Sequence, residues 1–232
     1  MHYKIQKNNN IHILYDPELA GEAPELLFSA RGEEPLERGI ARFFEHQGVP
    51  MVLKRYHRGG LIGKLIKKTY PVHSRERSRM WQEFRLLAAL RDLSLPVPEP
   101  VAARYRRNSP LTCQGELITA RINGAETLLD SLRRQSLERS LWRQIGGTIA
   151  RFHHHNVYHA DLNATNILID DQQQVFLIDF DKGRIRQVSS GNWKVDNLKR
   201  LRRSLDKLKG LHPQMHFSEA DWQLLLEGYD QG

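Results

Sequence analysis

Apolar residues in the second half of the chain recur at the spacing of one helical face. The steps are four, four and three residues, through Leu141, Ile145, Ile149 and Phe152. This spacing predicts a helix. Two short β-prone runs follow, at residues 167–169 and 175–178, and a polar turn at residues 170–174 separates them. A helix, a loop and a β-hairpin are therefore expected in succession.

The first half of the chain is expected to form short strands followed by a helix. The β-prone runs are residues 11–15, 40–44 and 51–56. Residues 77–91 carry a helical apolar stripe of Met80, Phe84 and Leu87. The prolines in residues 95–100 cannot continue that helix and predict a turn into the next strand. Residues 115–122 are expected to form the last strand of this half and a hinge.

Helices are also predicted nearer the C-terminus. Residues 125–134 are expected to begin a mainly helical second half. A later helix covers residues 194–209, with an apolar stripe of Leu198, Leu201, Leu205 and Leu208. We interpret its many basic residues as a solvated face over a packed face. The final helix covers residues 217–229, with Ser218 as N-cap and with Phe217 and Trp222 placed as a hydrophobic staple.

Composition indicates a soluble globular protein. Of 232 residues, 40% are hydrophobic and 27% are charged. No run approaches the roughly 18 to 20 apolar residues that span a bilayer. Residues 1–15 lack a basic segment followed by an apolar stretch, so we expect no secretory signal. Cys113 is the only cysteine, which excludes an internal disulfide and fits the cytoplasm.

The charge balance predicts anionic partners. The net charge is +8 and the isoelectric point is about 9.7. Residues 54–91 hold eleven Lys or Arg and two Glu. Within them, residues 55–68 mix basic and apolar side chains. That mixture suits a membrane interface, and it equally suits a helix packed on its own lobe.

The loop after the first helix described above holds a carboxylate and an amide, and a second carboxylate follows the hairpin. Asp161 and Asn166 lie five residues apart, and Asp179 ends an apolar run. Such residues often only cap helices or make turns. Transfer of a phosphoryl group from ATP, however, requires a base near the acceptor hydroxyl and two oxygen ligands for Mg²⁺. The spacing and the flanking elements together favour the metal centre of a protein-kinase-like fold.

A candidate ATP-orienting pair lies in the first half. Lys54 sits within the β-prone run of residues 51–56, and Glu83 lies beside the apolar stripe of the following helix. A strand lysine paired with a helix glutamate orients the phosphates of ATP in kinases. No complete glycine-rich phosphate loop occurs. Arg38-Gly39 is a reduced version or an ordinary turn, and Gly32 is the other candidate. The consecutive residues His153, His154 and His155 point in different directions on a helix, so we interpret them as surface or packing residues.

The chain resembles the lipopolysaccharide core sugar kinases, and among them the 3-deoxy-D-manno-octulosonic acid (Kdo) kinases of Gram-negative bacteria. The resemblance rests on residues 53–60, 95–98, 159–168, 178–182 and 193–198. The most discriminating segments are Arg58-Gly59-Gly60 and Asp179-Phe180-Asp181-Lys182.

This resemblance implies an α+β, protein-kinase-like fold with two lobes. A small antiparallel sheet lobe, residues 1–122, would bind the nucleotide, and a reduced helical lobe, residues 123–232, would hold the catalytic loop. The implied activity is phosphorylation of the 4-hydroxyl of Kdo on a lipid A precursor, at the cytoplasmic face of the inner membrane. ATP and Mg²⁺ are the implied cofactors. The expected partners are this precursor and the anionic membrane surface, with neither nucleic acid nor an obligate protein partner.

Carried over by position, Asp161 is the base, Asn166 and Asp179 are the metal ligands, and Lys54 with Glu83 orients ATP. Arg55 and Arg58 are candidate contacts to the acceptor carboxylate. Ala160 replaces the arginine of regulated protein kinases, and only 53 residues follow Asp179, so a protein substrate is not expected. The alternatives are a heptose kinase or other small-molecule phosphotransferase, and a degenerate kinase fold that binds nucleic acid or lipid.

Overall fold

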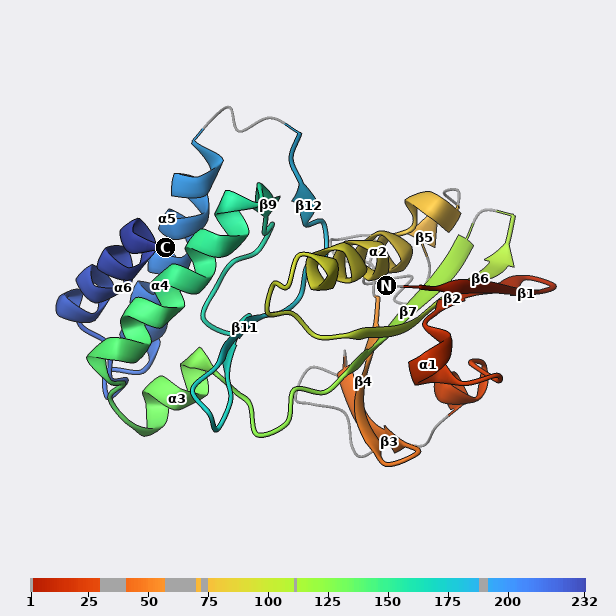
Figure 1. Ribbon diagram of the computed structural model, residues 1–232, viewed down its shortest axis with the longest axis horizontal. Coiled ribbons are helices and arrows are strands. Elements are labelled where there is room, and N and C mark those ends of the chain that lie inside the picture. Colours follow the sequence, from red (N-terminus) through yellow and green to blue (C-terminus); the bar gives the residue numbers. More distant parts are fainter. Residues whose placement is uncertain (1, 30–40, 57–69, 72–74, 111, 188–191) are drawn as a thin grey trace. The chain divides into compact units, whose positions relative to one another are not determined.

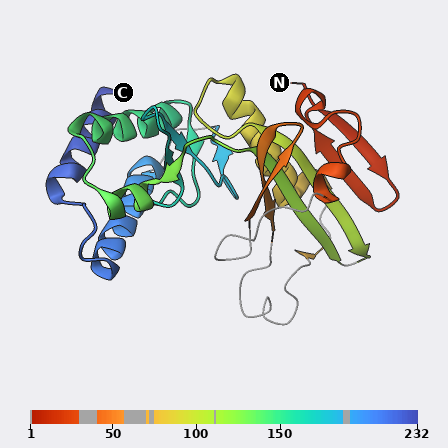
Figure 2. The ribbon, with the colours of Figure 1, turned by 90° about the horizontal axis from the view of Figure 1, so that it is seen from below.

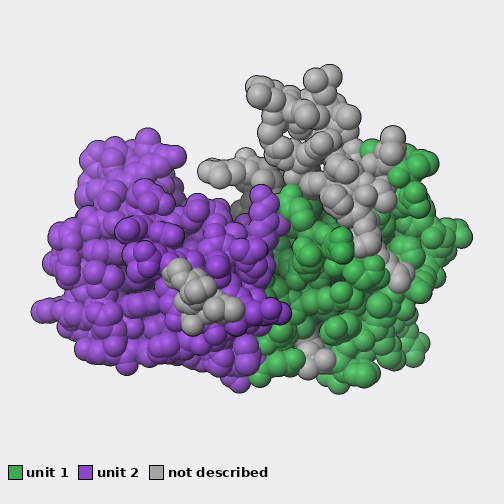
Figure 3. Space-filling view, turned by 90° about the horizontal axis from the view of Figure 1, so that it is seen from above, with its two compact units in different colours: residues 1–92, 98–121 green, residues 93–97, 122–232 purple. Residues whose placement is uncertain are grey.

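The chain forms two compact units, coloured separately in Figure 3. Unit 1 comprises residues 1–92 and 98–121, and unit 2 comprises residues 93–97 and 122–232. The computed structural model describes residues 2–29, 41–56, 70–71, 75–110, 112–187 and 192–232.

Unit 1 is built around an antiparallel sheet (Figures 1 and 2). The strand order is β1 (Lys4–Asn8), β2 (Ile11–Tyr15), β6 (Pro100–Ser109), β7 (Thr112–Ala120), β4 (Val49–Arg55) and β3 (Ala41–His46), and the short β5 (Tyr70–Pro71) pairs with β7. A two-residue turn joins β3 to β4. Its residues, Gln47 and Gly48, have φ angles of 52° and 78°, the positive values that this tight hairpin turn requires.

The two faces of the sheet carry different side chains. Leu53 and Lys54 are neighbours on β4, so they point to opposite faces. Leu53 belongs to a buried cluster with Met51, Phe28 and Ile118. The helix α2 (Arg79–Asp92) covers the face that carries Lys54. On this face the Met80 side chain of α2 lies over Gly115 of β7, in the space that a Cβ at this position would occupy.

Outside the sheet, unit 1 contains the short helix α1 (Pro17–Ala20) and two 3₁₀ segments, Leu26–Ser29 and Arg75–Arg77. The sequence pattern did not predict β1. That strand is an edge strand with mostly exposed residues, so it shows no alternation of apolar and polar positions.

Unit 2 is mainly helical. Its helices are α3 (Leu128–Arg134), α4 (Arg139–His154), α5 (Trp193–Leu211) and α6 (Glu219–Gln231). A small sheet has the order β11 (Val175–Leu177), β10 (Ile167–Ile169) and β8 (Glu126–Thr127), and β9 (Val157–Tyr158) pairs with β12 (Arg184–Ile185). The predicted helix, loop and hairpin are confirmed as α4, the loop between β9 and β10, and the antiparallel β10 and β11. The sheet unit and the helical unit confirm the α+β class.

Helices α4 and α6 approach each other closely because both carry a glycine at the contact. A Cβ on Gly146 would lie 1.9 Å from the carbonyl oxygen of Leu225. A Cβ on Gly228 would lie 2.0 Å from the carbonyl oxygen of Arg143. Any larger residue would push the two backbones apart.

The end of the chain follows its predicted pattern with one change. Ser218 is confirmed as the N-cap of α6, where it forms a capping box with Asp221. The buried stripe of α5 is Trp193, Asn197, Leu201 and Leu205, whereas Leu198 and Leu208 are only half-buried. The prediction for α5 therefore missed a buried asparagine, because a polar residue does not contribute to an apolar pattern.

Candidate active site

In unit 1 the structure brings Lys54 and Glu83 together. Lys54 Nζ lies 3.1 Å from Glu83 Oε1 and 3.0 Å from Oε2. The Glu83 side chain is buried, and it also accepts a hydrogen bond from the hydroxyl of Tyr56. The Tyr56 ring lies 4.9 Å from Lys54 Nζ. Sequence reasoning missed Tyr56, although its position two residues after Lys54 places it on the same face of the chain.

The other basic candidates of unit 1 have different surroundings. Arg55 Nε donates to Glu116 Oε1 at 3.1 Å, on the face opposite Lys54. Glu116 also accepts from Arg104, whose guanidinium pKa is lowered by burial. Arg58, together with the other residues of 57–69, lies outside the described part of the chain. The candidate phosphate-loop residues Gly32, Arg38 and Gly39 lie outside it as well.

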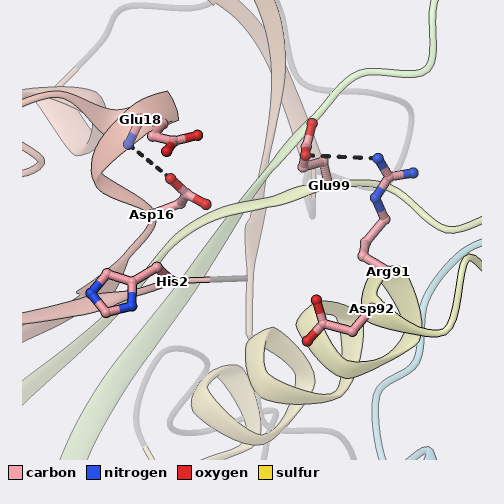
Figure 4. Close-up of a pocket in the computed structure, with 6 residues that line it drawn as sticks. All are labelled: His2, Asp16, Glu18, Arg91, Asp92 and Glu99. Carbon is pink, nitrogen blue, oxygen red and sulfur yellow. Dashed lines mark hydrogen bonds and ion pairs between the residues drawn. The ribbon is translucent and has the colours of Figure 1, made fainter.

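A polar pocket of about 340 Å³ also lies in unit 1 (Figure 4). It is lined by His2, Asp16, Glu18, Arg91, Asp92 and Glu99. Several of these side chains already interact within unit 1. Asp16 caps α1, and Glu99 Oε1 lies 3.7 Å from Arg91 Nη2. Neither Lys54 nor Glu83 lines this pocket.

In unit 2, His159 anchors the loop that carries Asp161. Its ring is buried, and Nδ1 accepts from the backbone N–H of Asp161 at 3.1 Å. The other nitrogen, Nε2, is therefore the protonated one, and it donates to the carbonyl oxygen of Ile178 at 2.9 Å. One neutral imidazole thus joins the residue before Asp179 to the backbone of Asp161.

Asn166 makes a second connection between the same segments. Its Nδ2 donates to the carbonyl oxygen of Asp161 at 2.8 Å. The backbone carbonyl oxygen of Asn166 accepts a hydrogen bond from the backbone N–H of Ile178 at 3.0 Å. Because Nδ2 is the donor in this hydrogen bond, the other terminal atom of the side-chain amide is the oxygen. Among the described residues, Asn166 Oδ1 has no hydrogen-bond partner. The side-chain oxygen of this largely buried residue is left available as a ligand.

Asp179 follows β11 with a φ of 63°. This left-handed conformation is uncommon for residues other than glycine, although Asp and Asn adopt it more readily than most. Phe180 holds the turn in place: it is buried, and its ring centroid lies 4.7 Å from that of His159 and 5.7 Å from that of Phe152. Local strain of this kind is typical of functional sites.

These residues fit a magnesium site of the kinase type. An amide oxygen and a carboxylate are the hard oxygen ligands that Mg²⁺ prefers, and Mg²⁺ takes its remaining ligands from phosphates and water. Among the described residues no group of three or more His, Cys, Asp or Glu forms a metal cluster. Two protein ligands completed by phosphates need no such cluster.

The Asp161 carboxylate is 64% exposed, so an acceptor in solution can reach it. Arg200 of α5 lies near this carboxylate, with Nη1 3.9 Å from Asp161 Oδ1. Sequence reasoning missed Arg200, because it assigned the basic residues of α5 to a solvated face.

His153 is buried in a polar network that also reaches this loop. Its Nδ1 lies 2.8 Å from the hydroxyl of Tyr229, and its Nε2 lies 3.4 Å from Asn197 Oδ1. Burial lowers the pKa of His153 to about 4, so the ring is neutral at physiological pH. His153 is thus a packing residue, whereas His154 and His155 are exposed.

No helix in the described part of the chain has the length and apolar character of a membrane span.

Comparison with known proteins shows the family of this chain. Residues 29–229 match the lipopolysaccharide kinase (Kdo/WaaP) family. Proteins named 3-deoxy-D-manno-octulosonic acid kinase are similar over most of their length. The one from Photobacterium profundum is 38% identical and covers 96% of each chain, and one from Haemophilus influenzae is 39% identical over 84% of this chain and 82% of its own.

A solved structure titled "WaaP in complex with acyl carrier protein" has the same fold. Its TM-score is 0.61 at 15% identity, and the match covers 100% of this chain and 90% of the other. The expected kinase-like fold is therefore confirmed. With the family match over residues 29–229, the chain belongs to the lipopolysaccharide kinase (Kdo/WaaP) family.

Proposed function

We propose that this enzyme, a sugar kinase, transfers the γ-phosphoryl group of ATP to the 4-hydroxyl of a Kdo residue on a lipid A precursor. The observation that carries the proposal is the identity of 38% over 96% of both chains with a protein named Kdo kinase. The choice of the 4-hydroxyl and of the lipid-linked acceptor follows the family resemblance. The protein then acts in lipopolysaccharide biosynthesis.

In the proposed reaction Asp161 is the general base. The sugar oxygen forms a bond to the γ-phosphorus, and the bond between that phosphorus and the bridging oxygen of ADP breaks. The hydroxyl proton passes to the Asp161 carboxylate, and ADP leaves with the electron pair of the broken bond. The exposure of Asp161 and the anchoring of its backbone by His159 and Asn166 support this role.

Asn166 Oδ1 and the Asp179 carboxylate would hold Mg²⁺. When bound, the ion neutralises the charge of the ATP phosphates. In unit 1, Lys54, held by Glu83 and Tyr56, would contact the α- and β-phosphates. The contacts at 3.0 and 3.1 Å support a pair that is preorganised before the nucleotide binds.

A lipid-linked acceptor would place the enzyme at the cytoplasmic face of the inner membrane as a peripheral protein. The net charge of +8 supports attraction to an anionic surface, and residues 55–68 are the proposed contact segment. Arg55 and Arg58 remain proposed contacts to the acceptor carboxylate. We expect no obligate protein partner and no nucleic acid partner.

The test is incubation of the purified chain with ATP, Mg²⁺ and Kdo-linked lipid A precursor, followed by mass spectrometry of the glycolipid. One added phosphate on the Kdo residue is the expected result. The control is Asp179→Asn, which keeps a residue that tolerates a φ of 63° but removes the charge, and it should lose Mg²⁺-dependent nucleotide binding and transfer together.

Other acceptors decide between the alternatives. If phosphate is found only on heptose-containing acceptors, the acceptor sugar is heptose and not Kdo, and the assignment as a kinase still holds. Nucleotide binding with no transfer to any acceptor would indicate a binding module. Addition of acyl carrier protein should not change the rate, and an absolute requirement for it would contradict the expectation of no obligate partner.

A further inference from the structure

One side of α5 lies along the catalytic loop. The Asn197 amide bonds the backbone of His159, Arg200 lies near Asp161, and the Ser204 hydroxyl accepts from the N–H of Ala164 at 3.4 Å. These three α5 residues are separated by three and four positions, the spacing of one helical side. The orientation of α5 relative to Asp161 is therefore set by contacts within unit 2.

The basic residues of α5 fall into two groups. Arg202 pairs with Asp206 at 2.8 Å and with Glu219 at 2.7 Å, so its charge is matched. Lys209 donates to the carbonyl oxygen of Met215. By contrast, Arg203 and Lys207 are exposed and have no ion-pair or hydrogen-bond partner in the described part of the chain.

Arg200, Arg203 and Lys207 form a continuous row, which we call the cation row. They stand at positions i, i+3 and i+7 of one helix, which places them on one side over about 10 Å. Arg200 is the end next to the base, and its 3.9 Å contact is at the outer limit of an ion pair. The nearest acidic residue along the helix, Asp196, lies one turn before Arg200 and forms no ion pair with it among the described residues.

Such a row does not stabilise the fold. Like charges three or four residues apart on a helix repel one another. No described carboxylate neutralises Arg203 or Lys207, and neither side chain is buried. The row begins with Arg200 beside a catalytic carboxylate and continues with two cations that no described carboxylate neutralises. Such a row is complementary to an anionic ligand whose reacting hydroxyl must reach that carboxylate.

We propose that the cation row binds the anionic groups of the acceptor and so presents its hydroxyl to Asp161. Arg200 takes the carboxylate of the sugar that receives the phosphoryl group. Arg203 and Lys207 take a phosphate on the neighbouring sugar of the glycolipid. This inference rests on the proposed function, which supplies an acceptor with both kinds of anion. It assigns acceptor contacts to unit 2, in addition to those proposed for Arg55 and Arg58.

The test compares phosphorylated and dephosphorylated acceptors with Arg203→Ala/Lys207→Ala. We expect the KM for the phosphorylated acceptor to rise about tenfold or more, as for loss of hydrogen bonds to a charged group. The KM for ATP should not change, because the row contacts the acceptor only. Removing the acceptor phosphate should raise the KM of the wild type to a similar extent and should not raise that of the variant further.

The matched control is Lys4→Ala/Lys7→Ala. It removes the same two charges from exposed positions of β1 in unit 1. If it weakens acceptor use as much as the α5 variant does, general electrostatic attraction explains the effect and the proposal is wrong. An equal loss by the α5 variant with both acceptors would also overturn it.

A binding measurement keeps the inference separate from the proposed function. Wild type and variants are titrated with micelles of phosphorylated lipid A precursor without Kdo, and with the dephosphorylated lipid. Preference of the wild type for the phosphorylated lipid, lost in Arg203→Ala/Lys207→Ala, supports the row even if Kdo proves not to be the acceptor. If the wild type does not prefer the phosphorylated lipid, the inference about the cation row is wrong, and the proposed transfer to Kdo is unaffected. Tighter binding to RNA than to either lipid, lost in the same variant, would assign the row to nucleic acid instead.

Discussion

The side-chain amide of Asn197 hydrogen-bonds both backbone groups of His159. Its Oδ1 accepts from the N–H at 3.3 Å, and its Nδ2 donates to the carbonyl oxygen at 3.0 Å. The same Oδ1 faces His153 Nε2. A buried residue of α5 thereby connects the start of the loop that carries Asp161 to the interior of unit 2.

Replacing Asn197 by Leu should both destabilise the fold and misplace the loop. The change leaves the backbone groups of His159 without these partners, at about 1–3 kcal/mol for each buried group. Chemical denaturation and kcat measured together should both show the loss. The exposed neighbour Lys199→Ala is the control and should change neither. An Asn197→Leu variant with normal stability and normal kcat would contradict the role of this contact.

Stability should fall between pH 6.5 and about pH 4 because of His153. Its pKa is lowered by burial, so in this window the unfolded chain binds a proton that the folded chain does not. The contribution of neutral His153 to the free energy of unfolding is fully present above pH 6.5 and is lost as the pH falls toward about 4. At 1.36 kcal/mol per pKa unit, the total loss is roughly 3 kcal/mol.

The measurement is urea denaturation across this range. His153→Gln removes the titrating group and should flatten the pH dependence, whereas His154→Gln, at an exposed neighbour, should keep it. Identical slopes for wild type and His153→Gln would show that other groups cause the loss of stability in acid.

Asp161→Asn should reduce kcat by about 10²- to 10⁴-fold, the usual contribution of general base catalysis. Affinity for ATP should change little, and so should stability, because the carboxylate is largely exposed. Single-turnover kinetics and nucleotide titration separate the two effects. Asp196→Asn, an exposed carboxylate on α5, is the control. Near-native turnover of Asp161→Asn would remove the assignment.

Lys54 and Glu83 should behave as one unit. In a double-mutant cycle with Lys54→Met and Glu83→Gln, the losses in kcat/KM should be strongly non-additive, because either change already misplaces the phosphates of ATP. Tyr56→Phe should have a smaller effect, because the ion pair between Lys54 and Glu83 remains. The exposed pair Arg143 and Glu227 is the comparison for stability, where coupling should stay below about 1 kcal/mol. Additive losses would mean that Lys54 and Glu83 act separately.

Gly146→Ala should destabilise unit 2 despite the higher helix propensity of alanine. The added methyl group would meet the backbone of Leu225, which cannot move without shifting α6, and overpacking of this kind costs about 1–3 kcal/mol. Thermal unfolding measures the effect. Gly147→Ala is the matched control, because its Cβ would lie 3.5 Å from the nearest backbone atom, an ordinary contact. Equal stability of the two variants would argue against a close contact between α4 and α6.

The sequence by itself determined the local elements and indicated a chemistry for the loop. The helical spacing from Leu141 to Phe152, the hairpin after it and the cap at Ser218 each depend on residues a few positions apart, so their pattern is visible along the chain. The same holds for Asp161, Asn166 and Asp179, whose types and spacing suggested a phosphoryl-transfer site. The β-prone run of residues 51–56 and the helical stripe of residues 77–91 also suggested Lys54 and Glu83 as a pair, which the structure brings into contact.

Only the tertiary structure decided which distant residues support that chemistry. Asn197 and Arg200 lie more than thirty positions after the loop, and they reach it because α5 packs beside it in one particular rotation. Gly146 and Gly228 acquire their role only where two helices cross. Such contacts depend on how helices and strands pack against one another once they have formed. The packing geometry depends on many side chains that are far apart in the sequence, so a local pattern of apolar and polar residues does not predict it.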